Sequence, residues 1–204
     1  MVNSARSEQS FLVRNRGNIG RLGFLFVVVG MLFTPSITAH YSLVDWLITC
    51  AGWLLALLGA GLRLWCTRYI GGRKDKELQT AGPYSLVRHP LYLGSLLITL
   101  GWVLALGNPL VALVVLGFFG LQYQVTINTE EAVLANLFGE QWETYTKSTP
   151  LFIPRLRLPK GQAPELVKPH FLRREYVTAG LVLFMLALSE LIKYLNLVGI
   201  LPLP

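Results

Sequence analysis

Long apolar stretches separated by short connections dominate this chain. Five of them, residues 22–39, 43–65, 91–106, 110–127 and 176–197, approach or reach the ~20 residues that a helix needs to cross ~30 Å of hydrocarbon. Of the 204 residues, 53% are apolar and 14% are charged, whereas a soluble domain carries about 25% charged residues. An open strand edge cannot be satisfied in lipid, so each span should be a helix. The sequence predicts an all-α, multi-pass membrane helix bundle of about five spans.

The short connections predict how the spans are paired. Residues 22–70 should form an N-terminal helical hairpin, 82–154 a central core, and 170–198 a C-terminal transmembrane helix, all within one integral membrane domain. The turn Gly107-Asn108-Pro109 should force a second hairpin inside the core. We expect the first stretch to be a retained span and not a cleaved secretion signal, because Ile37 is bulky where such a signal needs a small residue.

Positive charge is distributed unevenly between the two sides of the predicted membrane. The net charge is +7 and the isoelectric point is about 9.6. The connections near His40 and Asn108 have no Lys or Arg, whereas the other connections carry nearly all of them, so the N-terminus should be cytoplasmic and the C-terminus outside. Basic residues in this arrangement set topology and contact anionic headgroups, which argues against nucleic-acid binding. The segment 150–169, rich in proline and basic residues, should lie as an irregular strap along the cytoplasmic headgroups.

Small residues inside the spans predict close helix packing. Gly52, Ala56 and Ala60 recur every four residues and therefore share one helix face. Gly117 and Gly120 should allow a similar approach to the fourth span.

The other unusual side chains within the spans are read as structural. Glu190 and Lys193 lie one helical turn apart and should form an intramembrane ion pair or lie near the outer interface, because a lone charge at the bilayer centre costs roughly 2.5–3.5 kcal/mol. We favour structural pairing over a proton path. Cys50 and Cys66 lie ~24 Å apart along one predicted helix and cannot pair. No spacing of cysteine or histidine is typical of a metal site.

The first cluster that points to chemistry is residues 82–94, GPYSLVRHPLYLG, at the start of the third span. Pro90 suits the first position of a helix, which leaves Arg88 and His89 just outside a helix N-terminus. The free amides and the positive dipole end there favour a carboxylate or a phosphate. The alternative is an interfacial anchor, in which Arg88 binds lipid headgroups and the tyrosines form an aromatic belt.

The second cluster is Glu130-Glu131, directly after the fourth span. Residues 130–145 carry apolar side chains at helical spacing and predict a cytoplasmic amphipathic helix after the fourth span. Successive residues of a helix point about 100° apart, so one glutamate can face the bundle while the other faces water. The alternative is a solvated helix start without a binding role.

Taken together, the two clusters suit a zwitterionic, nucleotide-like cofactor with a positive centre. The glutamates can accept hydrogen bonds from its amine and ribose hydroxyls, and Arg88 and His89 can bind its carboxylate. Aromatic faces can bind its cation.

These motifs resemble a known family. The order GPYxxxRHPxYxG at 82–94, EExxLxxxFGxxWxxY at 130–145 and PxxIP at 150–154 is similar to the isoprenylcysteine carboxyl methyltransferases and to the wider group of bacterial and phospholipid methyltransferases. The resemblance implies a membrane enzyme that uses S-adenosyl-L-methionine at the cytoplasmic side, in the plasma or inner membrane if the chain is bacterial. The residues that it implies for the cofactor pocket are Tyr84, Arg88, His89, Pro90, Tyr92, Leu93, Gly94, Glu130 and Glu131. The chain departs from the shared core by continuing through a further span.

The expected reaction is methyl transfer to a lipophilic acceptor that enters from the bilayer. Isoprenylcysteine carboxylate, a phospholipid amine and a small lipophilic thiol, phenol or carboxylate are all compatible, and the sequence indicates no obligatory protein partner. Arg155, which the resemblance implies at the acceptor site, or Arg157 could orient a carboxylate acceptor. An amine or hydroxyl acceptor would need a base, for which Glu131 or His89 are the candidates. We therefore predict Glu131 and Arg155 as the catalytic residues.

Two other functions remain open at the level of sequence. An NADPH-dependent sterol reductase-like enzyme would need basic residues for the 2′-phosphate and a larger body. A non-catalytic membrane protein, such as a transporter subunit or an assembly factor, is the second alternative, although no inverted repeat supports transport.

Overall fold

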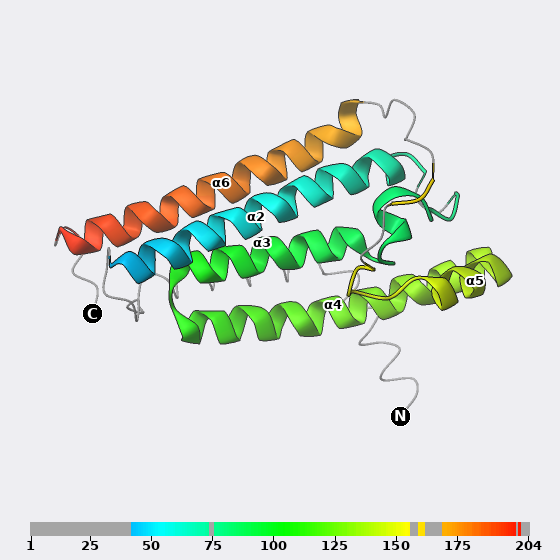
Figure 1. Ribbon diagram of the computed structural model, residues 1–204, viewed down its shortest axis with the longest axis horizontal. Helices are drawn as coiled ribbons and strands as arrows, with labels where there is room; N and C mark the ends of the chain where they lie inside the picture. The colour runs from blue at the N-terminus through cyan, green and yellow to red at the C-terminus, as the bar shows by residue number, and fades with distance from the viewer. Residues whose placement is uncertain (1–41, 74–75, 156–158, 162–168, 199, 201–204) are drawn as a thin grey trace.

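The computed structural model describes residues 42–73, 76–155, 159–161, 169–198 and 200. In these residues every regular element is helical, which confirms the all-α prediction for the described part of the chain. The elements are α2 (Leu43–Ile70), the 3-10 turn η1 (Gly82–Ser85), α3 (Pro90–Leu106), α4 (Pro109–Phe138), α5 (Glu140–Ser148) and α6 (Pro169–Leu197). Figure 1 shows α6, α2, α3 and α4 side by side in that order, with α5 beyond the end of α4.

Three of these helices are long and apolar enough to cross a membrane. They are α2, α4 and residues Pro169–Leu195 of α6. Helix α3 is also apolar but has 17 residues, or about 25 Å of length. The predicted span at 22–39 lies outside the described residues, so the count of five spans and the orientation of the chain remain predictions.

Helices α2 and α3 pack closely through glycines, as the small-residue pattern predicts. A Cβ atom added to Gly52 would lie 2.5 Å from the carbonyl oxygen of Gly101, and one added to Gly59 would lie 2.5 Å from that of Gly94. Ala56 between them is fully buried. No side chain larger than hydrogen fits at these crossings, so the glycines set the distance between the two helices.

The expectation that Gly117 and Gly120 allow close packing of α4 is wrong within the described residues. A Cβ atom added to Gly117 or Gly120 would have no heavy atom of another element within 4 Å. Among the described helices, α4 contacts mainly α3 and α5. Its face at these glycines is therefore not a packing face in the described part of the chain.

The predicted hairpin between the third and fourth spans is confirmed. Gly107 ends α3 with a φ of +64°, a left-handed conformation that glycine adopts without strain. The Asn108 side chain caps α4 by accepting a hydrogen bond from the Val111 amide at 3.0 Å, and Pro109 is the first helical residue.

The predicted amphipathic helix at 130–145 is divided in two. Helix α4 runs without interruption to Phe138, and α5 begins at Glu140 after Gly139 with a φ of +46°. The positive φ ends the first helix and allows the chain to change direction. Trp142 and Tyr145 of α5 are buried, so this short helix packs on the protein through its aromatic face.

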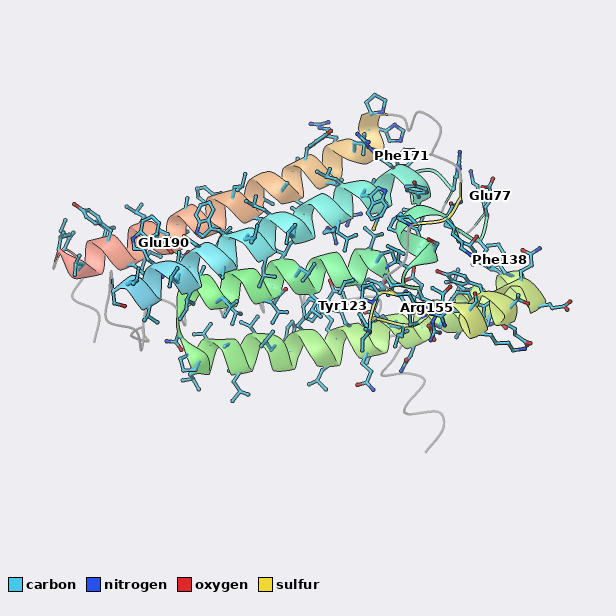
Figure 2. All side chains as sticks on the ribbon, in the orientation of Figure 1. Glu77, Tyr123, Phe138, Arg155, Phe171 and Glu190 are labelled. Atoms are coloured by element: carbon cyan, nitrogen blue, oxygen red, sulfur yellow. The ribbon has the colours of Figure 1, made fainter. Side chains whose placement is uncertain are left out.

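The predicted pairing of Glu190 with Lys193 near the end of α6 is confirmed and has a third member, whereas its position relative to the membrane stays a prediction. Lys193 Nζ lies 3.3 Å from Glu190 Oε1 and 3.7 Å from Asp45 Oδ1 of α2, and it donates to Thr49 at 3.3 Å. Figure 2 shows Glu190 at the opposite end of the bundle from Glu77. Burial of these charges is thus compensated by pairing between α2 and α6.

Candidate functional site

A tight turn and a strap position the first cluster. Ser85 Oγ donates to the Gly82 carbonyl at 2.7 Å and accepts from the Lys160 amide at 2.9 Å. The Arg88 amide donates to the Pro150 carbonyl at 2.9 Å, and the Arg155 amide donates to the Leu86 carbonyl at 3.2 Å. The described parts of segment 150–169 therefore hold residues 82–88 by hydrogen bonds to the backbone and to Ser85. The sequence predicted that this segment lies along the headgroups and did not predict these contacts.

Helix α3 begins as expected. His89 precedes it with non-helical backbone angles, and Pro90 is its first residue. Both residues are buried. Pro90 has no amide hydrogen, and the amides of Tyr92 and Leu93 donate to the His89 carbonyl at 3.1 Å, so Leu91 supplies the amide of the first turn that can bind an anion beside Arg88 and His89.

Both glutamates of α4 reach back to this helix start. Arg88 Nη1 donates to Glu131 Oε1 at 2.7 Å, and His89 Nε2 lies 3.1 Å from the same oxygen. The Tyr92 hydroxyl donates to Glu130 Oε2 at 2.6 Å. The expectation that one glutamate faces water is wrong, because each of the two carboxylates has a hydrogen-bond partner at or beside the α3 N-terminus.

Aromatic rings extend the cluster towards the middle of α4. His89 and Tyr92 stack with centroids 5.6 Å apart, and Tyr92 meets Tyr123 edge to face at 5.0 Å. Tyr123 in turn stacks on Phe119 at 3.9 Å. Figure 2 shows Tyr123 on the α4 side of α3. These rings offer apolar faces and a negative π surface to a bound cation.

These side chains border a cavity of about 560 Å³, a volume typical of small-molecule sites. It is lined by residues of all the described helices and of the connection after α2: Arg63, Ile70, Glu77, Leu78, Gln79, Tyr84, Arg88, His89, Pro90, Leu91, Tyr92, Gln122, Tyr123, Thr126, Glu130, Leu134, Trp142, Tyr145, Arg174 and Glu175. Six of the predicted site residues are among them, namely Tyr84, Arg88, His89, Pro90, Tyr92 and Glu130.

The other four predicted residues are not among the lining residues. Glu131 lies behind Arg88 and His89 and orders them. Gly94 contacts α2, where a Cβ atom would lie 2.7 Å from Arg63 Cγ. Leu93 is half-buried on α3, and the Arg155 side chain is exposed. The roles predicted for these residues in catalysis and cofactor binding stay predictions.

One buried ion pair in the cavity wall was not anticipated from the sequence. Arg63 of α2 binds Glu175 of α6 through two hydrogen bonds, Nε to Oε2 at 2.9 Å and Nη2 to Oε1 at 3.0 Å. Its Nη1 donates to Ser95 of α3 at 2.6 Å. The available signal was Arg63 itself, which with Asp45 is one of the two charged residues in the apolar run 43–65, since an intramembrane charge marks a candidate functional site.

Burial shifts the pKa of three groups around the cavity. Burial lowers the pKa of His89 below its ordinary value of 6.5, although the hydrogen bond with Glu131 opposes this shift. Burial raises the pKa of both Tyr84 and Tyr145 above the usual range, so both hydroxyls stay protonated. The Tyr145 hydroxyl donates to the Tyr84 carbonyl at 2.7 Å. At neutral pH the site therefore has a neutral imidazole beside paired arginine and glutamate.

The sequence was also compared with those of known proteins. Residues 47–141 match the model of the phospholipid methyltransferase family. The cobalt-zinc-cadmium resistance protein CzcN of Cupriavidus metallidurans is 39% identical over 163 residues, which cover 78% of this chain and 73% of that protein. The chain belongs to the phospholipid methyltransferase family.

Two further relatives are similar to the chain over different lengths. The nickel-cobalt-cadmium resistance protein NccN of Alcaligenes xylosoxydans is 36% identical over 162 residues, covering 78% of this chain and 73% of that protein. The protein-S-isoprenylcysteine O-methyltransferase of Schizosaccharomyces pombe is 42% identical over 85 residues, covering 40% of this chain and 34% of that protein. No solved structure matches the chain. Family membership and the apolar helices together indicate a membrane methyltransferase.

The family match has a clear structural extent. It begins within α2 and ends within α5, so it includes α3 and α4. It therefore contains the hydrogen-bonded residues Arg88, His89, Tyr92, Glu130 and Glu131. Helix α6, which contributes Arg174 and Glu175 to the cavity, lies beyond it.

Proposed function

We propose that this family member transfers a methyl group from S-adenosyl-L-methionine to a lipophilic acceptor at the cytoplasmic face of the membrane. The observation that carries the proposal is the cavity at the α3 N-terminus, where the Arg88–Glu131–His89 and Tyr92–Glu130 groups meet. The acceptor would enter from the bilayer between apolar helices, and the cofactor would enter from the aqueous side past the connection that carries Glu77.

Two unsatisfied atoms support a polar ligand in this cavity. The Tyr84 hydroxyl and Arg88 Nε are buried and have no hydrogen-bond partner among the described residues. A buried polar atom without a partner costs about 1–3 kcal/mol. Both belong to residues that line the cavity, so a bound molecule with oxygen or nitrogen atoms would relieve this cost.

The residues present fit the chemical groups of the cofactor. Arg88 and the Leu91 amide at the start of α3 would bind its carboxylate, and Glu130 would bind its amine or ribose hydroxyls. The faces of Tyr92 and Tyr123 would stabilise its positive sulfur by cation–π attraction. When bound, this cofactor supplies a methyl group already activated for displacement. The protein needs mainly to align the acceptor and exclude water, effects that can supply ~7–11 kcal/mol.

The charges in and near the cavity are compatible with a zwitterionic ligand that carries a net positive charge. Three arginines and three glutamates line it, and Glu131 adds a carboxylate behind Arg88. The His89 imidazole is neutral at pH 7 because burial lowers its pKa. The lining charges thus balance formally, and the carboxylate of Glu131 behind Arg88 adds one negative charge close by, which favours the net positive charge of S-adenosyl-L-methionine.

We infer that Glu131 acts mainly by positioning. Its Oε1 atom already accepts from Arg88 and His89, so the role of general base predicted from the sequence would require this arrangement to break. A carboxylate acceptor would need no base at all, whereas an amine or a phenol would need one.

Calorimetry with S-adenosylhomocysteine and with NADPH tests the proposal. Binding of the first and not of the second is expected, and the reverse would favour a reductase. Methylation of lipophilic acceptors by labelled cofactor in proteoliposomes should be lost in the His89→Ala, Glu131→Ala double variant. Unchanged activity in that variant would show that the site assignment is wrong.

The names of two relatives suggest a process to which the reaction could contribute. Because CzcN and NccN are named metal-resistance proteins, we propose that methyl transfer by this chain contributes to tolerance of divalent heavy metals. Growth of a host at raised cobalt, zinc or cadmium, with the wild type and with the double variant above, tests this extension. Equal tolerance in the two strains would contradict it.

A further inference from the structure

A second cavity lies at the other end of the bundle, where α2 begins and α6 ends (Figure 1). Its volume is about 500 Å³, within the range of small-molecule sites. The lining residues come from one face of α2 and from α6: Asp45, Trp46, Thr49, Cys50, Trp53, Leu54, Leu57 and Glu190. None of these residues lines the cavity at the α3 N-terminus, so the two sites are separate.

This second cavity changes from polar to apolar along α2. Charged groups gather at the end of the bundle, where Lys193 contacts both Asp45 and Glu190. The deeper end is apolar and reaches Leu57, about 18 Å along the helix from Asp45. The cavity therefore matches a molecule with a polar head and one apolar chain.

The polar end carries more negative than positive charge. Lys193 Nζ lies 3.7 Å from Asp45 Oδ1 and 3.3 Å from Glu190 Oε1. Among the described residues of this cluster, two carboxylates thus share one ammonium group, and one negative charge is left over. A charge without compensation between apolar helices is costly. A ligand with a single positive charge would remove this cost.

Glu190 is the charged member of the cluster that the cavity exposes most. Its Oε1 atom is buried beside Lys193 and accepts no hydrogen bond from the described residues, yet 32% of the side chain is exposed. The side chains of Asp45 and Lys193 are only 8% and 9% exposed. A cation that enters the cavity therefore meets Glu190 first, and the rings of Trp46 and Trp53 add π surfaces that attract the same charge.

We propose that the second cavity binds a single-chain amphiphilic amine, with its ammonium group on Glu190 and its alkyl chain along Leu54 and Leu57. A primary ammonium group donates N–H bonds to a carboxylate and carries the one positive charge that the cluster lacks. A phospholipid amine suits the site less well, because its phosphate would bring a further negative charge beside two carboxylates. The inference does not depend on the proposed function, since the two cavities share no lining residue.

Cys50 gives a direct report on occupancy of the cavity. It lines the cavity and is exposed, whereas Cys66 is fully buried. Alkylation of Cys50 by N-ethylmaleimide is followed by mass spectrometry on purified full-length protein in dodecyl maltoside. Dodecylammonium is compared with dodecanol, which has the same chain and no charge. The amine should protect Cys50 at a concentration about tenfold lower than the alcohol, and short-chain phosphatidylethanolamine should protect no better than dodecanol.

Glu190→Gln keeps the shape of the side chain and leaves the Asp45–Lys193 pair in place. It should raise the concentration of dodecylammonium for half protection about tenfold and leave that of dodecanol unchanged. Glu143→Gln is the matched control, because it makes the same change at an exposed position of α5 that lines neither cavity, and it should change neither value. Trp53→Leu is a second variant that keeps all the charges, and it should weaken protection by the amine about threefold.

Thermal unfolding shows whether each variant is folded before its protection is compared. The inference is overturned if the two probes protect the wild type equally, if neither protects it, or if folded Glu190→Gln or Trp53→Leu protein binds the amine as the wild type does. A Cys50 that does not react in the absence of any probe would also overturn it, because another part of the chain or a second copy would then occupy the cavity. Stronger protection by phosphatidylethanolamine than by dodecylammonium would overturn the choice of ligand.

Discussion

Arg63 and Glu175 are 112 residues apart in the chain, yet the guanidinium of one binds both carboxylate oxygens of the other at 2.9 and 3.0 Å. The contact joins α2 to α6, and Ser95 adds α3 through a 2.6 Å hydrogen bond. Three helices are thus tied together beside the cavity by a single side chain. Both partners are largely buried, with 19% and 9% of their side chains exposed, so neither charge can rely on water if the other is removed.

Glu175→Ala should therefore destabilise the protein strongly. Removal of one partner of a buried ion pair costs about 3–5 kcal/mol, because the remaining charge is left without compensation. The double variant Arg63→Met, Glu175→Leu should recover most of this loss, since an apolar pair of similar volume avoids the desolvation of both charges. Thermal unfolding in detergent measures both effects, and an equal loss in the single and double variants would contradict the explanation.

The hydroxyl of Tyr92 should matter for cofactor affinity more than for stability. Tyr92→Phe keeps the ring contacts with His89 and Tyr123 but loses the 2.6 Å hydrogen bond to Glu130. Without it Glu130 is less well oriented, so affinity for S-adenosylhomocysteine should fall by roughly tenfold, the value of one hydrogen bond to a charged group. Calorimetry measures this change.

Tyr145→Phe provides the contrast. Its hydroxyl donates to the backbone carbonyl of Tyr84 at 2.7 Å in a buried place. Loss of that bond should lower the free energy of unfolding by about 1 kcal/mol and affect cofactor binding less than Tyr92→Phe does. The opposite ranking of the two variants would argue against the assignment of Glu130 to the cofactor.

Stability should decline below pH 6.5 in a way that depends on His89. Because burial lowers its pKa in the folded state, the unfolded chain takes up a proton first as the pH falls through 6.5. The contribution of this group is complete above 6.5 and decreases towards the lower folded pKa, by up to about 1.4 kcal/mol per pH unit. His89→Gln should flatten this part of the profile of unfolding free energy against pH, and an unchanged slope would contradict the shift.

The glycines at the α2–α3 crossing should not tolerate alanine. A Cβ atom on Gly101 would lie 2.6 Å from the Ala56 amide nitrogen, so Gly101→Ala forces the helices apart and should cost about 1–3 kcal/mol. Gly117→Ala is the matched control. Its Cβ atom meets nothing within 4 Å, and the change should stabilise the helix by about 0.5–1 kcal/mol. Thermal unfolding of the two variants should therefore shift in opposite directions.

Local signals in the sequence were sufficient for several elements. The α3–α4 turn followed from Gly107, Asn108 and Pro109, whose conformational preferences act within a few residues. Pro90 marked the start of α3 for the same reason. The division of 130–145 at Gly139 was missed, because an amphipathic pattern has the same period on both sides of a break.

Other features depended on which helices became neighbours. Small residues on α2 and α4 look alike in sequence, but only those on α2 face another described helix. Whether a glutamate at the end of α4 faces water or protein likewise depends on the position of α3. Nothing in the local pattern of Glu130 and Glu131 contains that information.

The sequence by itself determined that the chain is a membrane-embedded helical protein, and it identified the Arg88-His89 and Glu130-Glu131 clusters, because hydropathy and short motifs are properties of contiguous residues. Only the tertiary structure decided that Arg63 and Glu175 meet in the wall of the same cavity, and that Arg174 lines it while Arg155 does not. The physical reason is that pairing of buried charges and the shape of a cavity arise from side chains on different helices, whose packing no local pattern specifies.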